Sequence, residues 1–337
     1  MRFGRAGSLG VFLVLTACSS PPSSPMASQS ASLAEAALAE PAIHVIGDRP
    51  VLNASDLDGR SAVLPGAFTI VDLTYHAFLV GFGDEIGDQR PFYATSSDGV
   101  TWAVADGDPL ERIGLELAAP GPIPTSVLIE TDGSWTMYIW GRSDPAGVQA
   151  ASVWRATATA ASGPWVADPA PVLTPGVDGW DSRDVDFPSV VRTADGYLMA
   201  YSGVTDGEIV HIGLATSTDG IAWTKLPEPI ISPGHCGDFD DRSITIPRLI
   251  GTDVGYLIVY LAFATDSNDA AVGLSASADG LTWACASPTP LLERSDVPGS
   301  QGIHTIALAE GMGRPQLLVE SLVEGGSELW LAELIEP

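Results

Sequence analysis

The stretch GLATSTDGIAW (213–223) returns in altered form three more times along the chain. The other copies read YATSSDGVTW (93–102), GLSASADGLTW (273–283) and, in degraded form, RATATAASGPW (155–165). Blocks such as DFPSVVRTADGYLMAYSG (186–203) precede these copies. A long repeated unit made of short strands and turns is typical of repeat architectures.

The spacing of the repeat can be measured from three residues that open similar apolar runs. Asp186, Thr245 and His304 do so, and both 245 − 186 and 304 − 245 give 59 residues. Two earlier runs, PTSVLIETDG (124–133) and FTIVDLTYHAF (68–78), stand at comparable intervals. The chain therefore has five units, which begin near residues 66, 123, 184, 243 and 302.

Each unit has the pattern of four short strands. The runs are rich in Val, Ile, Tyr and Trp and are bounded by pairs such as Asp195-Gly196 and Asp219-Gly220. Asp-Gly suits tight turns because Gly accepts a positive φ and Asp bonds its own turn backbone. The sequence therefore predicts an all-β fold, a five-bladed β-propeller.

The fifth unit is shorter than the others. It contains GIHTIALAEG, RPQLLVESLV and SELWLAELIE but no outer strand like WTKLPEPII or WVADPAPVL. The N-terminal segment IHVIGDRPVL (43–52) has the character of that strand. We expect this N-terminal strand to pair with the last blade and close the ring, because closure removes exposed sheet edges.

The N-terminus has the pattern of an export signal. Arg2 and Arg5 precede the apolar stretch SLGVFLVLTA, which is too short to span a membrane as a helix. The following Leu15-Thr16-Ala17-Cys18 resembles the bacterial lipobox, although an ordinary signal peptide with an incidental cysteine is the alternative. We expect a lipoprotein signal peptide over 1–17, lipidation at Cys18, a lipid-anchored flexible linker over 18–41 and the propeller domain over 42–337. This predicts a cell-envelope protein that faces the periplasm or the exterior.

Charge limits the partners of the protein. The formal net charge is −27, so the surface repels nucleic acid and anionic lipid. We expect no nucleic-acid partner, and membrane contact through the lipid anchor only. Two cysteines remain besides Cys18, and in an exported protein Cys236 and Cys285 suggest a disulfide. The alternative is that they lie at opposite ends of the fourth blade.

Candidate chemistry gathers where the units begin. The five inner-strand openings are Gly66, Ile123, Asp186, Thr245 and His304, and propellers usually bind ligands around such openings. Two crossings, GWDSRDVDFP (179–188) and DFDDRSITIP (238–247), share the pattern aromatic-Asp-x-Arg. In this alignment Asp181 matches Asp240, and Arg183 matches Arg242.

The string WDSRDVDFPSVVRTADGYLMAYSG resembles the five-bladed glycoside hydrolases, a group that includes the arabinanases and xylosidases of family 43, the fructosidases and the mannoside phosphorylases. The resemblance spans about residues 43–334. It implies carboxylates from different inner strands, acting as base, acid and modulator of the acid. Asp186 matches the modulator, and His304 resembles the fifth-blade histidine near an axial metal or water site. The base and acid positions hold Gly66 and Thr245 instead.

The departures leave a rearranged or a lost active site. In the rearranged site the catalytic residues are Asp186, Asp240, Asp241 and Asp181. The substrate-binding residues are Trp180, Asp184, Arg183, Arg242, Arg248 and His304, and His304 is also the candidate metal ligand. No cofactor is required by this interpretation, although calcium or water can occupy the axial channel.

Simpler roles are open for the same residues. Trp180 alternatively covers the end of the domain, and the arginines alternatively neutralise nearby carboxylates. The SxDGxxW strings are interpreted as structural turns. Glu320 and Glu324 are expected to face solvent on the last blade.

Two functional hypotheses follow from the sequence. The first is a surface-anchored glycoside hydrolase-like protein that acts on arabinan, xylan, fructan or mannan. The alternative is a non-catalytic propeller lipoprotein that binds a glycan or another ligand, and a scaffold role in an envelope complex also stays open. The sequence has no zinc-type ligand cluster, P-loop or nucleophile elbow.

Overall fold

The computed structural model describes residues 41–335, apart from 86–87, 111–112, 114, 116–117, 143–149, 206, 208 and 311–312. Its contacts separate residues 1–37 from a second unit over 38–337. The predicted signal peptide, Cys18 and residues 19–40 of the predicted linker lie outside the described residues. Within the described part, no helix is long and apolar enough to cross a membrane.

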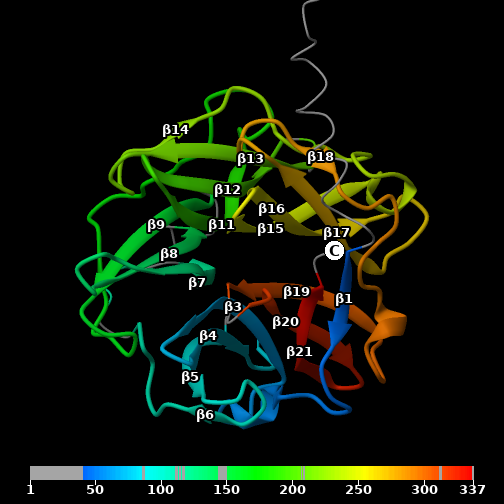
Figure 1. Cartoon of the computed structure of the whole chain (residues 1–337). Coiled ribbons are helices and arrows are strands. Elements are labelled where there is room, and N and C mark those ends of the chain that lie inside the picture. The colour runs from blue at the N-terminus through cyan, green and yellow to red at the C-terminus, as the bar shows by residue number, and fades with distance from the viewer. Residues whose placement is uncertain are drawn as a thin grey trace, which may run out of the picture. The chain divides into compact units, whose positions relative to one another are not determined.

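The second unit consists of five antiparallel sheets arranged around an axis (Figure 1). Blade 1 has β3 (Ala62–Val71), β4 (Thr74–Phe82), β5 (Gln89–Ser96) and β6 (Trp102–Val104). Blade 2 has β7 (Ala118–Ile129), β8 (Trp135–Arg142), β9 (Ser152–Ala158) and β10 (Val166–Ala167). Blade 3 has β11 (Asp184–Thr193), β12 (Gly196–Val204), β13 (Val210–Ser217) and β14 (Thr224–Lys225).

Blade 4 has β15 (Ser243–Thr252), β16 (Gly255–Phe263), β17 (Ala270–Ser277) and β18 (Ala284–Cys285). Blade 5 has β19 (Gly302–Ala309), β20 (Gln316–Val323), β21 (Gly326–Ile335), β1 (Ala42–Val45) and β2 (Leu52–Asn53). Short 3-10 helices cover Ala54–Asp56, Asp238–Asp240 and Arg294–Asp296. The predicted all-β, five-bladed propeller is confirmed.

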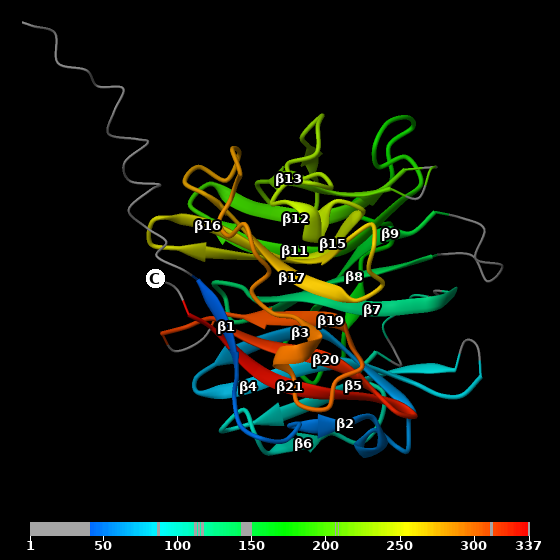
Figure 2. The ribbon, with the colours of Figure 1, turned by 90° about the vertical axis from the view of Figure 1, so that its right-hand side faces the viewer.

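The N-terminal strand closes the ring, as the sequence predicts. β1 pairs antiparallel with β21, from Ala42 opposite Ile335 to Val45 opposite Ala332. β2 pairs with the same strand further along, where Leu52 lies opposite Leu329. Figure 1 shows the blue β1 beside the red β21, and Figure 2 shows the same pair from the side. The two ends of the propeller sequence therefore share one sheet.

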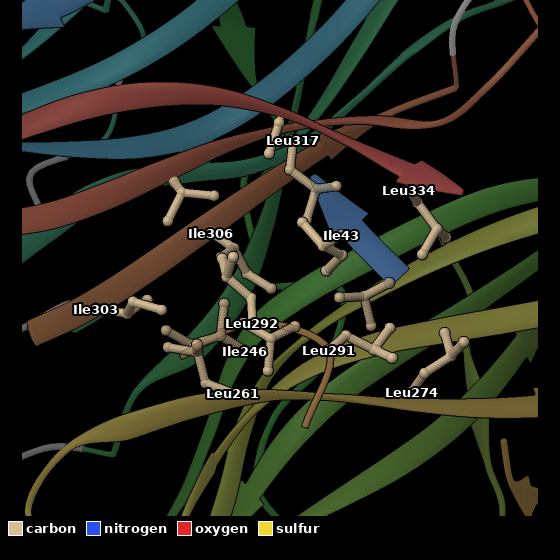
Figure 3. Packing of buried hydrophobic residues seen from close by; sticks show 14 of the residues in the cluster. Ile43, Ile246, Leu261, Leu274, Leu291, Leu292, Ile303, Ile306, Leu317 and Leu334 are labelled. Carbon is tan, nitrogen blue, oxygen red and sulfur yellow. The ribbon is translucent and has the colours of Figure 1, made fainter. Parts of the chain in front are cut away.

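The closing strand also contributes to the core between the last two blades. Ile43 is 5% exposed and belongs to a cluster with Leu274, Leu292, Ile306 and Leu334. Figure 3 shows these side chains meeting between strands of blades 4 and 5. Burial of this apolar surface, together with strand pairing, attaches β1 to the ring.

The repeated SxDGxxW string forms one hydrogen-bonded turn, which confirms its structural interpretation. In blade 3, Ser217 Oγ accepts from the Gly220 amide, and Asp219 Oδ1 accepts from the next two amides. Trp223 Nε1 donates to the Gly220 carbonyl at 3.2 Å. The same bonds recur around Asp98 in blade 1 and Asp279 in blade 4.

Each inner strand carries a register shift at the same place in its blade. In β11 and β15 the shift falls at residues with positive φ, Phe187 at 48° and Ile246 at 52°. Such angles are strained for bulky side chains, above all for a β-branched isoleucine. The bulges therefore change the direction of the Phe187 and Ile246 side chains near the propeller axis, and this has a local cost in conformational energy.

The cysteines expected to remain after lipidation are joined. Cys236 and Cys285 form a disulfide with their Cα atoms 5.3 Å apart. The bond ties the crossing before blade 4 to the outer strand β18. The two cysteines therefore lie at the same end of the blade.

The closure generates a first prediction. Ile43→Ala should lower the free energy of unfolding by about 2–5 kcal/mol, because it empties a buried site between blades. His44→Ala is the matched control, since His44 lies on the same strand and is exposed. Equilibrium urea unfolding of both variants measures the difference. Equal stability of the two variants would show that β1 contributes nothing through its buried face.

Candidate functional site

Apolar side chains pack around the starts of the inner strands, a region called the mouth below. Leu64, Ile123 and Trp140 form one buried cluster, against which Phe187 packs. The rings of Trp140 and Phe187 have centroids 5.0 Å apart. Phe187 also packs against the cluster that contains Ile246, which comes from blade 4. Phe187 therefore reaches from blade 3 to both of its neighbours.

Asp186 is the one carboxyl at the five inner-strand openings. It lies opposite Ser202 of β12, immediately before the bulge of β11. Its Oδ1 atom is buried and has no hydrogen-bond partner among the described residues. Burial, followed by the negative charge of Asp184, raises the pKa of Asp186 to about 7. Asp186 is therefore a carboxyl that exchanges a proton near neutral pH.

Asp184 has a different role from Asp186, although it is only two residues away. It is 3% exposed, and its Oδ1 accepts from the Ala151 amide at 2.8 Å. The same oxygen lies 3.0 Å from Arg142 Nη1, and Oδ2 lies 3.3 Å from Arg183 Nε. These bonds join blade 3 to blade 2, so Asp184 holds the position of the strand that carries Asp186.

His304 and Glu320 form a pair at the opening of blade 5. His304 Nδ1 lies 3.0 Å from Glu320 Oε2; the histidine side chain is 60% exposed and the carboxylate 2%. The hydrogen bond to Glu320 raises the pKa of His304. The expectation that Glu320 faces solvent is wrong, because its side chain points inward to the histidine. The repeat indicates the inward position of Glu320. Because 320 − 261 is again 59, Glu320 takes the place in blade 5 that Leu261, the strand partner of Thr245, takes in blade 4.

Packing explains why a glycine stands at position 66, where the resemblance to the five-bladed glycoside hydrolases led us to expect the base. A Cβ atom at Gly66 would lie 2.2 Å from the Pro124 carbonyl oxygen and 2.8 Å from that of Phe78. Neither backbone oxygen can yield without moving a strand, so no side chain fits there. Thr245, at the other altered position, has its hydroxyl 3.2 Å from that of Ser202.

Asp181 and Asp240, both predicted as catalytic, occupy equivalent enclosed places. Asp181 is 6% exposed, accepts from Tyr201 Oη at 3.0 Å and pairs with Lys225. Asp240 is 0% exposed and accepts from Tyr260 Oη at 2.9 Å and from two backbone amides. These contacts make both residues anchors of the crossing loops, and their catalytic role stays a prediction.

The other crossing residues are more exposed. Asp241 is exposed, and its Oδ1 accepts from the Thr265 amide. Arg242 lies over the ring of Phe263, 5.6 Å from its centroid. Trp180 stacks on Tyr201 and donates to the Pro227 carbonyl at 3.0 Å. That arrangement favours the alternative role of Trp180, in which it covers the end of the domain.

Arg248 lies beyond the bulge of β15, away from the mouth. It is 2% exposed, and it lines a cavity formed by the later halves of the inner strands. The structure therefore brings Asp184, Asp186 and Arg183 together, whereas Arg248 belongs to a separate place in the channel.

His304, the predicted metal ligand, has Glu320 beside it. Within the described ranges, no three His, Cys, Asp or Glu side chains are grouped so that they could hold a metal ion. Calcium takes about six to eight oxygen ligands. The exposed His304 with a single carboxylate partner does not fit that requirement.

No protein-family model matches the sequence, and no curated protein matches it. Solved structures do match. One of them comes from work on the GH130 family of mannoside phosphorylases, which contains glycoside hydrolases that target beta-1,2 mannosidic linkages in Candida mannan. Its TM-score is 0.63 at 18% identity, and the match covers 80% of this chain and 84% of that chain.

Two further structures share the architecture. A family 117 glycoside hydrolase from the marine bacterium Zobellia galactanivorans has a TM-score of 0.59 at 18% identity, covering 87% of this chain and 90% of its own. A thermostable family-43 glycoside hydrolase has a TM-score of 0.63 at 15% identity, covering 82% and 90%. The chain has the fold of these glycoside hydrolases. At such identities the similarity establishes the propeller and leaves the chemistry to the site.

The raised pKa of Asp186 generates a second prediction. The folded value of about 7 exceeds the unfolded value of 3.8, so the stability due to the protonated carboxyl is fully present below about pH 4 and is lost as the pH rises to about 7. The amide in Asp186→Asn cannot ionise. The free energy of unfolding of this variant at pH 8 should therefore exceed that of the parent by about 2–4 kcal/mol. At pH 3 the two proteins should be equal.

Chemical denaturation at both pH values measures this effect. Asp184→Asn is the control, because it weakens the ion pairs with Arg142 and Arg183 and should lower stability at pH 8. A variant at Asp186 that is less stable than the parent at pH 8 would contradict the raised pKa of this carboxyl.

Proposed function

We propose that the protein hydrolyses a glycan at the propeller mouth, with Asp186 as the acid that protonates the glycosidic oxygen. The observation that carries the proposal is that Asp186 is a half-buried carboxyl at an inner-strand opening, and its Oδ1 has no partner within the described chain. A carboxyl with a pKa of about 7 stays largely protonated in mildly acidic solution, and a general acid needs that form. The fold shared with glycoside hydrolases supports the same class of reaction.

The base in this proposal is His304. Its imidazole is exposed at the opening of blade 5, and Glu320 holds Nδ1, which leaves Nε2 for a water molecule. Inverting hydrolysis needs an acid on one side of the sugar and a base on the other. An imidazole takes the part that a carboxylate at position 66 would play, where packing leaves no space.

Substrate binding in this proposal uses the apolar collar of the mouth. Phe187 presents an aromatic ring next to Asp186, and flat rings suit the apolar faces of sugars. The substrate class is a polysaccharide of the arabinan, xylan, fructan or mannan type. The protein is anchored through Cys18 at the cell surface, and this anchoring belongs to the proposal.

The alternative is a propeller that binds glycan without cleaving it. The observation in its favour is that Gly66 and Thr245 replace both carboxylates of the related enzymes. In this version Asp186 and Phe187 orient the sugar.

The decisive experiment incubates the full chain with arabinan, xylan, fructan and mannan oligosaccharides and identifies products by mass spectrometry. Asp186→Asn should lower the rate of cleavage by about 10²-fold or more, since it removes the transferable proton. Asp195→Asn is the matched control, because Asp195 is exposed in the turn at the other end of the same hairpin. Cleavage that survives Asp186→Asn undiminished would exclude Asp186 as the acid, and binding without cleavage would select the alternative.

The pH dependence provides a separate prediction. The profile of kcat/KM should be bell-shaped. Activity falls at high pH because Asp186, with a pKa of about 7, loses the proton it must donate. It falls at low pH because His304, whose pKa is raised by Glu320, becomes protonated and cannot act as base. Initial rates between pH 4 and pH 9 measure the profile. A rate that stays constant between pH 7 and pH 9 would show that this proton is not used.

A further inference from the structure

The later halves of the inner strands are joined by a repeated contact, which Arg248 replaces in one blade. Immediately after the bulge, blade 2 has Ser126 and blade 3 has Ser189. Ser126 Oγ accepts from the Val190 amide at 3.0 Å, and Ser189 Oγ accepts from the Leu249 amide at 2.9 Å. Each serine thereby ties its inner strand to that of the next blade.

Arg248 occupies the same position after the bulge of blade 4. Its Nε donates to the Ile306 carbonyl of blade 5 at 2.6 Å, in place of the serine contact. The longer side chain continues across the channel, where Nη1 donates to the Thr125 carbonyl of blade 2 at 3.2 Å. One guanidinium thus connects three blades.

The guanidinium is left with an unmet charge and an unmet donor. Arg248 is 2% exposed, and its Nη2 atom has no hydrogen-bond partner among the described residues. No described carboxylate forms an ion pair with it; Arg192, on the same cavity wall, pairs with Glu130 at 2.6 Å. A buried charge without a counter-charge is strongly unfavourable, and here burial lowers the pKa of Arg248 to about 9.

The cavity beside Arg248 has room for a partner. Its volume is about 450 Å³, and residues from all five inner strands line it. The acidic side chains on its wall are Asp253 and Glu310, and Glu310 accepts from the Gly251 amide at 2.9 Å. The cavity lies past the bulges from Asp186, so its occupant is separate from the proposed glycan site.

We propose that this cavity binds a small oxyanion, such as sulfate, phosphate or a carboxylate, that accepts hydrogen bonds from Nη2 of Arg248. An arginine is suited to such a ligand because its planar donors match oxyanion geometry. The bound anion supplies the missing counter-charge where blades 2, 4 and 5 meet. It stabilises the closed ring by an amount that grows with anion concentration.

Calorimetric titration of the full chain with sodium sulfate, phosphate and acetate, at constant ionic strength set by sodium chloride, tests the proposal. At least one of the three should bind saturably at one site per chain. Arg248→Met should weaken that binding at least tenfold, because it keeps the length of the side chain and removes the donors. Arg155→Met is the matched control, because Arg155 pairs with Asp168 and does not line the cavity, and it should change the affinity less than twofold.

A second measurement does not depend on the variant folding. Crystals of the unmodified protein soaked in selenate should show an anomalous peak within hydrogen-bond distance of Arg248 Nη2. Absence of saturable binding to all three oxyanions, equal affinity of Arg248→Met, or water alone beside Nη2 would overturn the proposal. Binding of chloride alone would overturn the oxyanion class.

Discussion

The pairing of β1 with β21 is the constraint on which the rest of the propeller depends. It joins residues from the two ends of the domain in one sheet, from Ala42 opposite Ile335 to Val45 opposite Ala332. Without it the last blade would expose an unpaired edge, and the core between blades 4 and 5 would lose Ile43. Because Asp186 and His304 are held by inner strands of different blades, their relation in space exists only in the closed ring.

Closure brings the inner strands close together, and this proximity shapes the chemistry of the channel. At Gly66 the approach of blade 2 leaves no space for a side chain. At Phe187 a positive φ turns an aromatic ring toward the neighbouring blades. Asp186 is the one carboxyl among the five residues that open the inner strands, and apolar groups such as Phe187 lie beside it. The same low-polarity surroundings that complete the core make that carboxyl reluctant to ionise.

The two halves of the channel contain ionisable groups of opposite sign that share one property. Asp186, before the bulges, is half-buried and Arg248, beyond them, is buried, and each has one buried polar atom without a partner in the described structure. Burial shifts both pKa values toward the neutral form, upward for the acid and downward for the base. A fold tolerates the free-energy cost of an unpartnered, ionisable group where other contacts offset that cost. Groups with shifted pKa values of this kind are concentrated where ligands bind.

The sequence by itself determined the blades, their turns and their closure, because these depend on local patterns that repeat. Alternation, Asp-Gly turns and a spacing of 59 residues predict strands without knowledge of distant contacts. The places of Asp186 and His304 at the openings of inner strands were predicted for the same reason, since each opens a unit. The burial of Asp181 and of Asp240 was decided only by the tertiary structure, although each lies in a recognisable repeat. Whether a carboxylate is free, paired or enclosed depends on its neighbours in space. Those neighbours, such as Ala151 for Asp184 or Thr125 for Arg248, come from blades far along the chain.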